Sequence, residues 1–453
     1  MINTARLCCI ALVLCALSIS ASAQDSIEGY WEGAMVRDGA VRIIKVNFFK
    51  EGEATKARFE MPDFITYGLR LMDVKRDASK ISFRIPLHGD VTLNLDPAGE
   101  MRGAMGNSSP PTTIHLRRAI RPAEIPVKRE EGQFQNGEVQ LAGTLIAPAT
   151  AGPHPIIVWI HGRGGTLRED SARAKLFAQR GVASLIYDKR GSGKSTGDLS
   201  KATINDLAAD AIAAVEYLAT RKDINASQIG LHGESAGGWI VPIVATRSKA
   251  PVAFIMTSVG PAESLEDQQI HAYEHMLRLS DTKYTEAEIA MAREYARLRM
   301  RYIFRNEGQQ EYEAAINKIK STRLAGEIIF PQAQDARDID WLRRNNYDPA
   351  PDLKKIKAPF LAFYGGKDYV VPPEENVKRL EGYLTEAGNK DFRVVTIADA
   401  GHDLSFDDIL RRTSNQGMED YQWVWGRVAP EYVETMLDWL LKHVTVAKGA
   451  SSL

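Results

Sequence analysis

The sequence predicts an α/β protein with a mostly parallel sheet, helices on both faces of that sheet, a helical insertion and a small N-terminal antiparallel β domain. Three observations support this fold class. Short alternating strands fill residues 25–121, apolar strand-like runs alternate with helical segments over residues 134–445, and residues 262–345 are rich in helix formers without β-branched runs. A chain of 453 residues has room for two or three such folding units.

Residues 1–23 are typical of a cleavable export signal. Arg6 supplies a positive charge, residues 7–18 are almost entirely apolar, and residues 21–23 are small, as signal peptidase requires. We expect cleavage after Ala23 and export to the periplasm or the medium. A membrane anchor is the alternative, but it needs about 20 apolar residues, so we expect no membrane span in the mature chain.

The cysteine content and the charge exclude several classes of protein. Cys8, Cys9 and Cys15 all lie in the export signal, so the mature chain has no thiol for a disulfide, for zinc or for nucleophilic catalysis. The formal net charge is −1, which offers no basic field for a nucleic-acid partner. The sequence carries no signal for an oligomeric state.

The N-terminal region, residues 25–121, is typical of a small antiparallel sheet or barrel. Alternating runs at 41–46, 80–85 and 91–95 are separated by turn signals. Prolines between residues 107 and 126 mark a linker to the next domain.

Strand and helix candidates alternate from about residue 134 to residue 445. Residues 155–160 form a continuous apolar run of the kind that is buried on both faces of a parallel sheet, and residues 204–218 carry apolar residues at helical spacing. This alternation predicts parallel strands joined by helices. Further strand candidates are residues 182–187, 229–232, 252–257, 360–364 and 392–397.

The motif that indicates chemistry is Gly-Glu-Ser-Ala-Gly at residues 233–237. It directly follows the strand candidate 229–232 and precedes a helix-like stretch, residues 238–247. The glycines permit a turn so sharp that larger side chains would clash, which exposes Ser235 at the carboxyl edge of the sheet. We therefore predict that Ser235 is a nucleophile.

A serine nucleophile needs a base, and the base needs a carboxylate to orient it. His402 follows the last strand candidate, and Asp368 follows the strand candidate before that one. Loops at the carboxyl ends of neighbouring parallel strands meet, so we predict that His402 is the base and that Asp368 orients it. Asp403 is the alternative acid, but its side chain should point away from the neighbouring imidazole ring.

An oxyanion formed during catalysis requires preorganised backbone donors. We expect one donor at the amide of Ala236, next to the nucleophile. The second is expected at the amide of Arg163, in the loop His-Gly-Arg-Gly-Gly at residues 161–165. His161 itself is expected to be structural.

The insertion at residues 262–345 follows the strand after the predicted nucleophile. A helical cap over the active site is the functional interpretation, and an extra solvated helical layer is the alternative. His271 and His275 have the spacing of a helical metal pair, but no third ligand is evident, so we expect no metal. Residues 191–196 end like a phosphate-binding loop, yet Asp188 stands where that pattern requires glycine.

With these residues in place, the chain resembles the α/β-hydrolase superfamily over about residues 134–445. It is most similar to bacterial two-domain serine carboxylesterases and prolyl-oligopeptidase-like hydrolases, which carry Tyr-Asp-Lys-Arg-Gly-Ser-Gly-Lys-Ser, here at 187–195, and Ser-Ala-Gly-Gly-Trp, here at 235–239. The order serine, aspartate, histidine is that of the superfamily. The resemblance implies hydrolysis of small-molecule carboxylic esters through an acyl-enzyme, with no metal or organic cofactor.

The N-terminal region departs from the prolyl-oligopeptidase pattern. Residues 25–121 are too few for a propeller with several four-stranded blades, which favours an esterase. A peptidase, amidase or thioesterase of the same fold is the alternative function. A binding protein on a hydrolase scaffold is a third hypothesis, and the complete serine, aspartate and histidine set argues against it.

Overall fold

The structure is a computed structural model, and it divides the chain into two compact units. Among the residues that the structure describes, the first unit lies within 26–121 and the second within 125–446. The predicted export signal and Gly165 lie outside the described residues. The structure describes residues 26–37, 40–62, 66–86, 89–106, 111–121, 125–164, 168, 172–328, 336–405 and 428–446.

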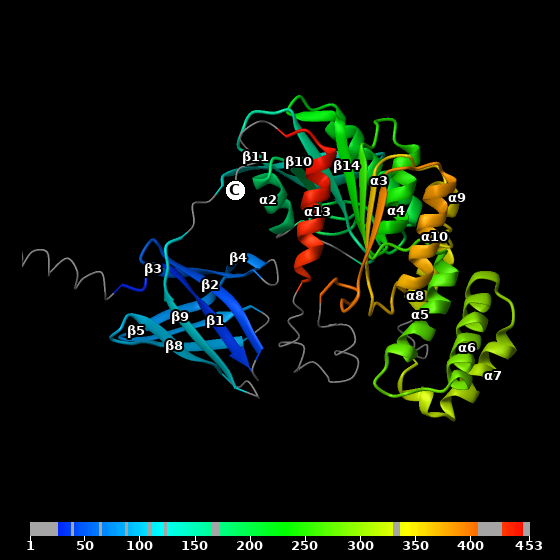
Figure 1. The fold of residues 1–453 in the computed structure, drawn as a ribbon, viewed down its shortest axis with the longest axis horizontal. Helices are drawn as coiled ribbons and strands as arrows, with labels where there is room; N and C mark the ends of the chain where they lie inside the picture. Colours follow the sequence, from blue (N-terminus) through cyan, green and yellow to red (C-terminus); the bar gives the residue numbers. More distant parts are fainter. Residues whose placement is uncertain are drawn as a thin grey trace, which may run out of the picture. The chain divides into compact units, whose positions relative to one another are not determined.

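One nine-stranded antiparallel sheet forms the first unit (Figure 1). Its strands are β1 (Gly29–Arg37), β2 (Ala40–Glu51), β3 (Ala54–Met61), β4 (Thr66–Arg70), β5 (Met72–Asp77), β6 (Lys80–Ile85), β7 (Gly89–Leu95), β8 (Glu100–Met105) and β9 (Thr112–Arg118). Their order is β4-β3-β2-β1-β9-β8-β7-β6-β5, so the first and last strands pair in the middle. The antiparallel β domain that the sequence predicts is therefore present.

The sheet of the first unit curls around an apolar core. The Leu71 amide, just before β5, donates a hydrogen bond of 3.0 Å to the carbonyl of Ala57 in β3, so the edge strand β5 lies close to the opposite end of the sheet. Alternate residues of β6 face inward, as its burial pattern shows. The indole of Trp31 is completely buried and its Nε1 donates to the Ile27 carbonyl at 2.8 Å.

The second unit is an eight-stranded, mostly parallel sheet. Its strands are β10 (Val127–Asn136), β11 (Val139–Pro148), β12 (His154–Ile160), β13 (Ala183–Tyr187), β14 (Ile224–Glu234), β15 (Phe254–Ser258), β16 (Phe360–Gly365) and β17 (Phe392–Ile397). Their order is β10-β11-β13-β12-β14-β15-β16-β17. β10 and β11 form an antiparallel hairpin, β11 pairs antiparallel with β13, and every later pair is parallel.

Helices cover both faces of this sheet, and strand β12 shows why its sequence is continuously apolar. Ile156 and Val158 belong to the core beneath one set of helices, whereas Ile157 and Trp159 belong to the core on the opposite face. The first core is shared with α3 (Ile204–Ala219), α4 (Gly237–Arg247) and α10 (Pro373–Glu386); the second is shared with α2 (Ala172–Gln179) and α13 (Pro430–His443). Every residue of β12 is consequently buried.

Helices also occupy the segment between β15 and β16. They are α5 (Leu265–Leu279), α6 (Glu286–Arg305), α7 (Gln309–Lys320), the 3-10 turn η2 (Arg323–Gly326), α8 (Ala336–Arg344) and α9 (Ala350–Leu353). Thr285 starts α6 with a reciprocal capping box to Glu288. The helices have an apolar cluster of their own around Tyr295, while Met300 and Ile303 of α6 reach the core of the sheet.

Within the described ranges, none of the helices combines the length and the apolar composition that a membrane span requires.

Candidate active site

Ser235 lies in a sharp turn between β14 and α4. Its φ is +51°, an uncommon value for a residue with a side chain, and its amide donates to the Ser258 carbonyl at 2.9 Å. A Cβ on Gly233 would lie 2.7 Å from the Gly237 carbonyl oxygen, and a Cβ on Gly237 would lie 2.6 Å from the Ile160 carbonyl oxygen. Glycine is therefore required on both sides of the serine.

The structure brings Ser235, His402 and Asp368 into one chain of hydrogen bonds. His402 Nε2 lies 3.0 Å from Ser235 Oγ, and His402 Nδ1 lies 2.8 Å from Asp368 Oδ2. Both distances are within ordinary hydrogen-bonding range. In this arrangement Nδ1 donates to the carboxylate, which leaves Nε2 able to accept the serine proton.

Close packing of two loops holds the histidine beside the aspartate. Gly365 is the last residue of strand β16 and Gly366 follows it, while the segment 398–402 follows strand β17. A Cβ on Gly365 would lie 2.3 Å from the Gly401 carbonyl oxygen, and a Cβ on Gly366 would lie 2.3 Å from the Ala398 carbonyl oxygen. Larger residues at either glycine would push the loops apart and separate the imidazole from the carboxylate.

The carboxylate of Asp368 is fully buried and is oriented by the backbone. Its Oδ1 accepts hydrogen bonds from the amides of Val370, at 2.8 Å, and Val371, at 3.0 Å. Because Oδ1 is held by these amides, Oδ2 faces the imidazole of His402. The alternative acid, Asp403, instead accepts bonds from the amide and hydroxyl of Ser405, at 3.1 Å and 2.5 Å.

The pKa of His402 is raised above its ordinary value. Burial by itself would lower this pKa, but the charge of Asp368 and the hydrogen bond to it stabilise the imidazolium and outweigh the effect of burial. The imidazole is therefore a stronger base than a free histidine.

The loop after β12, which carries Arg163, lies against the serine. A Cβ on Gly162 would be 3.1 Å from Ser235 Cβ, so Gly162 permits the close approach. Ala236 follows the serine directly, and among the described residues none accepts a hydrogen bond from its amide. His161 Nε2 is bound to the Tyr187 carbonyl at 3.1 Å, and burial lowers the pKa of His161.

A partly buried polar network behind the serine had no signal in the sequence. Arg173 of α2 donates to Glu234 Oε2 at 3.0 Å and to the Tyr432 hydroxyl of α13 at 2.8 Å. The Tyr432 hydroxyl meets Ser258 Oγ at 2.7 Å, and His232 Nε2 meets the same oxygen at 2.8 Å. Burial lowers the pKa of His232 to about 3, so its ring is neutral at physiological pH.

The phosphate-loop-like segment at residues 191–196 folds around a carboxylate of the protein. Asp188 Oδ2 accepts from the amide of Lys194 at 2.9 Å, and Asp188 Oδ1 accepts from the amide of Arg168 at 2.8 Å. A Cβ on Gly193 would lie 2.4 Å from Asp188 Oδ2. The aspartate therefore takes the place that an anionic ligand would occupy in a phosphate-binding loop.

Of the two histidines with metal-pair spacing, His271 is held by a carboxylate of the protein. His271 Nδ1 is bound to the buried carboxylate of Glu263 at 2.6 Å, which raises the pKa of His271. Across the described part of the chain, no cluster of three or more histidine, cysteine or acidic residues has the geometry of a metal site.

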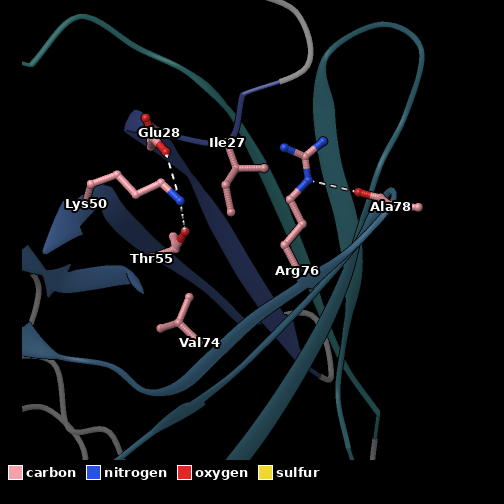
Figure 2. A pocket seen from close by; sticks show the side chains of 7 residues that line it. All are labelled: Ile27, Glu28, Lys50, Thr55, Val74, Arg76 and Ala78. Atoms are coloured by element: carbon pink, nitrogen blue, oxygen red, sulfur yellow. Dashed lines mark hydrogen bonds and ion pairs between the residues drawn. The ribbon is translucent and has the colours of Figure 1, made fainter. Parts of the chain in front are cut away.

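A pocket of about 470 Å³ lies in the first unit, and none of Ser235, Asp368 and His402 lines it (Figure 2). Lys50 Nζ donates to Thr55 Oγ1 at 3.1 Å and lies 3.6 Å from a carboxylate oxygen of Glu28, while Arg76 Nε donates to the Ala78 carbonyl at 2.9 Å. No serine, cysteine or histidine lines it; the lining residues are Ile27, Glu28, Lys50, Thr55, Val74, Arg76 and Ala78.

The fold and the site together define a serine hydrolase of the α/β-hydrolase class. The chain belongs to the family described as serine aminopeptidase, S33, whose model matches residues 151–409. Esterase EstD of Thermotoga maritima is 24% identical to the chain over 360 residues, which cover 77% of this chain and 76% of the esterase.

Two solved structures similar to parts of the chain are an esterase and a peptidase. An esterase of Pyrococcus furiosus matches with a TM-score of 0.45 and 15% identity, over 72% of this chain and 95% of that one. A proline iminopeptidase of Mycobacterium smegmatis matches with a TM-score of 0.43 and 15% identity, over 69% of this chain and 98% of that one.

Replacing Asp368 with asparagine should lower the pKa of His402, because a neutral amide no longer stabilises the imidazolium. An NMR titration of the His402 ring measures this, and the wild-type pKa is expected above about 6.5. Asp403→Asn is the matched control, since Asp403 binds Ser405, and it should shift the pKa much less. An unchanged pKa in Asp368→Asn would contradict the geometry.

Proposed function

We propose that the protein hydrolyses carboxylic esters of small molecules through an acyl-enzyme intermediate. Ser235 is the nucleophile, His402 is the general base, and Asp368 orients His402. The observation that carries this proposal is the continuous hydrogen-bond chain from Ser235 Oγ through the imidazole to Asp368, with lengths of 3.0 Å and 2.8 Å.

In the first half of the proposed reaction, Ser235 Oγ forms a bond to the ester carbonyl carbon while His402 Nε2 takes the hydroxyl proton. The carbonyl oxygen becomes an oxyanion, which the amides of Ala236 and Arg163 bind. The bond to the alcohol then breaks, and Nε2 returns the proton to the departing alkoxide.

In the second half, water replaces the alcohol. His402 Nε2 takes a proton from water, the water oxygen attacks the acyl carbon, and the bond to Ser235 Oγ breaks as the serine recovers its proton. Asp368 stays ionised throughout and compensates the positive charge on the imidazole. The carboxylic acid leaves, and the enzyme returns to its starting state.

Similarity to esterase EstD over most of both chains supports an ester rather than an amide substrate. A peptidase or amidase is the second candidate function, because the family description names a serine aminopeptidase. Aminoacyl anilides distinguish the two candidates, since an amidase would cleave them at rates comparable with esters.

We also propose that the helical insertion caps the active site. Gln268 of α5 donates to the carbonyl of Val370, in the loop that carries Asp368. The guanidinium of Arg163 lies 4.2 Å from the ring centre of Trp341 in α8. The insertion therefore contacts the loop that carries Asp368 and the loop that carries the proposed oxyanion donor Arg163. These contacts are the ones expected of a cap that shapes the acyl pocket.

Replacing Ser235 with alanine should abolish hydrolysis of p-nitrophenyl acetate, because the nucleophile is lost. We expect kcat to fall by at least about 10⁴-fold, as in other serine hydrolases that lose a triad member. A fluorophosphonate probe should label the wild type and not Ser235→Ala. Ser227→Ala, at an exposed serine, is the control and should keep both activity and labelling; a wild type inactive on all esters would refute the proposal.

Replacing Trp341 with alanine should weaken the binding of long acyl chains, because the cap would lose an aromatic surface. We expect KM for p-nitrophenyl hexanoate to rise about fivefold, or ~1 kcal/mol, relative to KM for the acetate. Trp341→Phe keeps an aromatic ring and should stay near the wild type. Equal changes for both esters would instead favour an outer helical layer that does not touch substrate.

We further propose that residues 1–23 direct export to the periplasm or the medium. N-terminal sequencing of the protein recovered from these fractions should begin at Gln24. Ala23→Arg should block cleavage, because signal peptidase requires a small residue at this position. Recovery of the uncleaved wild type in the cytoplasm would contradict this assignment.

A further inference from the structure

Lys189 is a buried cation whose hydrogen bonds go to backbone carbonyls. It follows strand β13, and only 5% of its surface is exposed. Its Nζ donates to the carbonyl of Gly162, and also to the carbonyl of Gly164 at 2.9 Å. Both carbonyls belong to the loop that carries Arg163. This loop follows strand β12, which pairs with β13.

The charged neighbours of Lys189 are engaged with other partners. Asp188 pairs with the guanidinium of Arg168 and binds loop amides, and Arg190 pairs with Asp210 at 2.7 Å. Within the described ranges no carboxylate lies within ion-pair distance of Lys189 Nζ. A buried ammonium is costly unless it is hydrogen bonded, so its two carbonyl contacts are its principal stabilisation.

The contact with Gly162 fixes the direction of the neighbouring amide. The Gly162 carbonyl and the Arg163 N–H belong to one trans peptide unit, in which the two groups point in opposite directions. When Lys189 holds the carbonyl on one side, the Arg163 N–H must point to the other. Gly162 also lies against Ser235, because a Cβ on Gly162 would be 3.1 Å from Ser235 Cβ. This peptide unit is therefore adjacent to the nucleophile.

We propose that Lys189 is a positioning residue that orients the Arg163 amide toward the oxyanion of the reaction. The inference rests on the proposed esterase function. Its physical basis is that an oxyanion donor contributes only when its N–H is aimed at the developing charge before the reaction begins. A glycine-rich loop cannot supply that rigidity by itself, because glycine restricts the backbone least.

The charge on Lys189 gives this arrangement a distinctive pH dependence. Burial lowers the pKa of Lys189 to about 8. The facing titratable group is His161, whose pKa is itself lowered by burial, so it is neutral where Lys189 loses its proton. Above pH 8 the ammonium becomes an amine with fewer and weaker donors, and activity should decline.

The test compares Lys189→Met and Lys189→Arg with the wild type on p-nitrophenyl acetate between pH 6 and pH 10. Methionine keeps the length of the apolar stem but donates no hydrogen bond. We expect kcat of Lys189→Met to fall about 10- to 100-fold, with KM changed less than about threefold, because the donor acts in the transition state. The decline above pH 8 should disappear in both variants, since neither side chain deprotonates there.

Lys194→Met is the matched control, because Lys194 is an exposed lysine in the same segment. It should retain the activity and the pH profile of the wild type. Thermal melting and circular dichroism report the folded fraction of each variant, by which kcat is normalised. A normalised kcat of Lys189→Met within twofold of the wild type, or an alkaline decline that persists in it, would overturn the inference.

The outcomes also separate this inference from the proposed function. A wild type that hydrolyses no ester would overturn the proposed function, and the inference with it. A wild type that hydrolyses esters while Lys189→Met behaves identically would overturn only the role of Lys189.

Discussion

The backbone of Ser235 holds a φ of +51° between β14 and α4, and the rest of the site depends on this turn. The conformation costs on the order of 1–3 kcal/mol, so surrounding contacts must compensate for it. Glycines at 233 and 237 let the chain pass within contact distance of neighbouring carbonyls, and the Ser258 carbonyl fixes the serine amide at 2.9 Å. The serine hydroxyl is thereby presented in one direction before any substrate arrives.

The parallel sheet supplies the partners of that serine from distant parts of the sequence. Ser235, Asp368 and His402 each follow the carboxyl end of a strand, and β14 to β17 lie in order across the sheet. The Arg173 network supports the same turn through α2 and α13. The partly buried guanidinium of Arg173 is stabilised here because it is paired with Glu234 and hydrogen bonded to Tyr432.

The sequence was most informative where local geometry dictates residue type. The glycines around Ser235 and the order of strands before Asp368 and His402 allowed the fold class and these three positions to be predicted, because a tight turn admits few alternatives. The contacts of Arg173 and Lys189 could not be predicted. Arg173 and Tyr432 are 259 positions apart in the sequence. Lys189 binds backbone carbonyls, which every residue has, so no sequence motif marks its partners.

Pairing of the first and last strands of the β domain also has a consequence for how such chains can be assembled. Trp31 near the start of β1 is opposite Arg118 at the end of β9, and the Ala119 amide donates to the Tyr30 carbonyl at 2.9 Å. The polypeptide thus enters and leaves this domain at adjacent points. A domain whose two ends are adjacent can be inserted into another chain, or removed from it, without separating the residues that flank it.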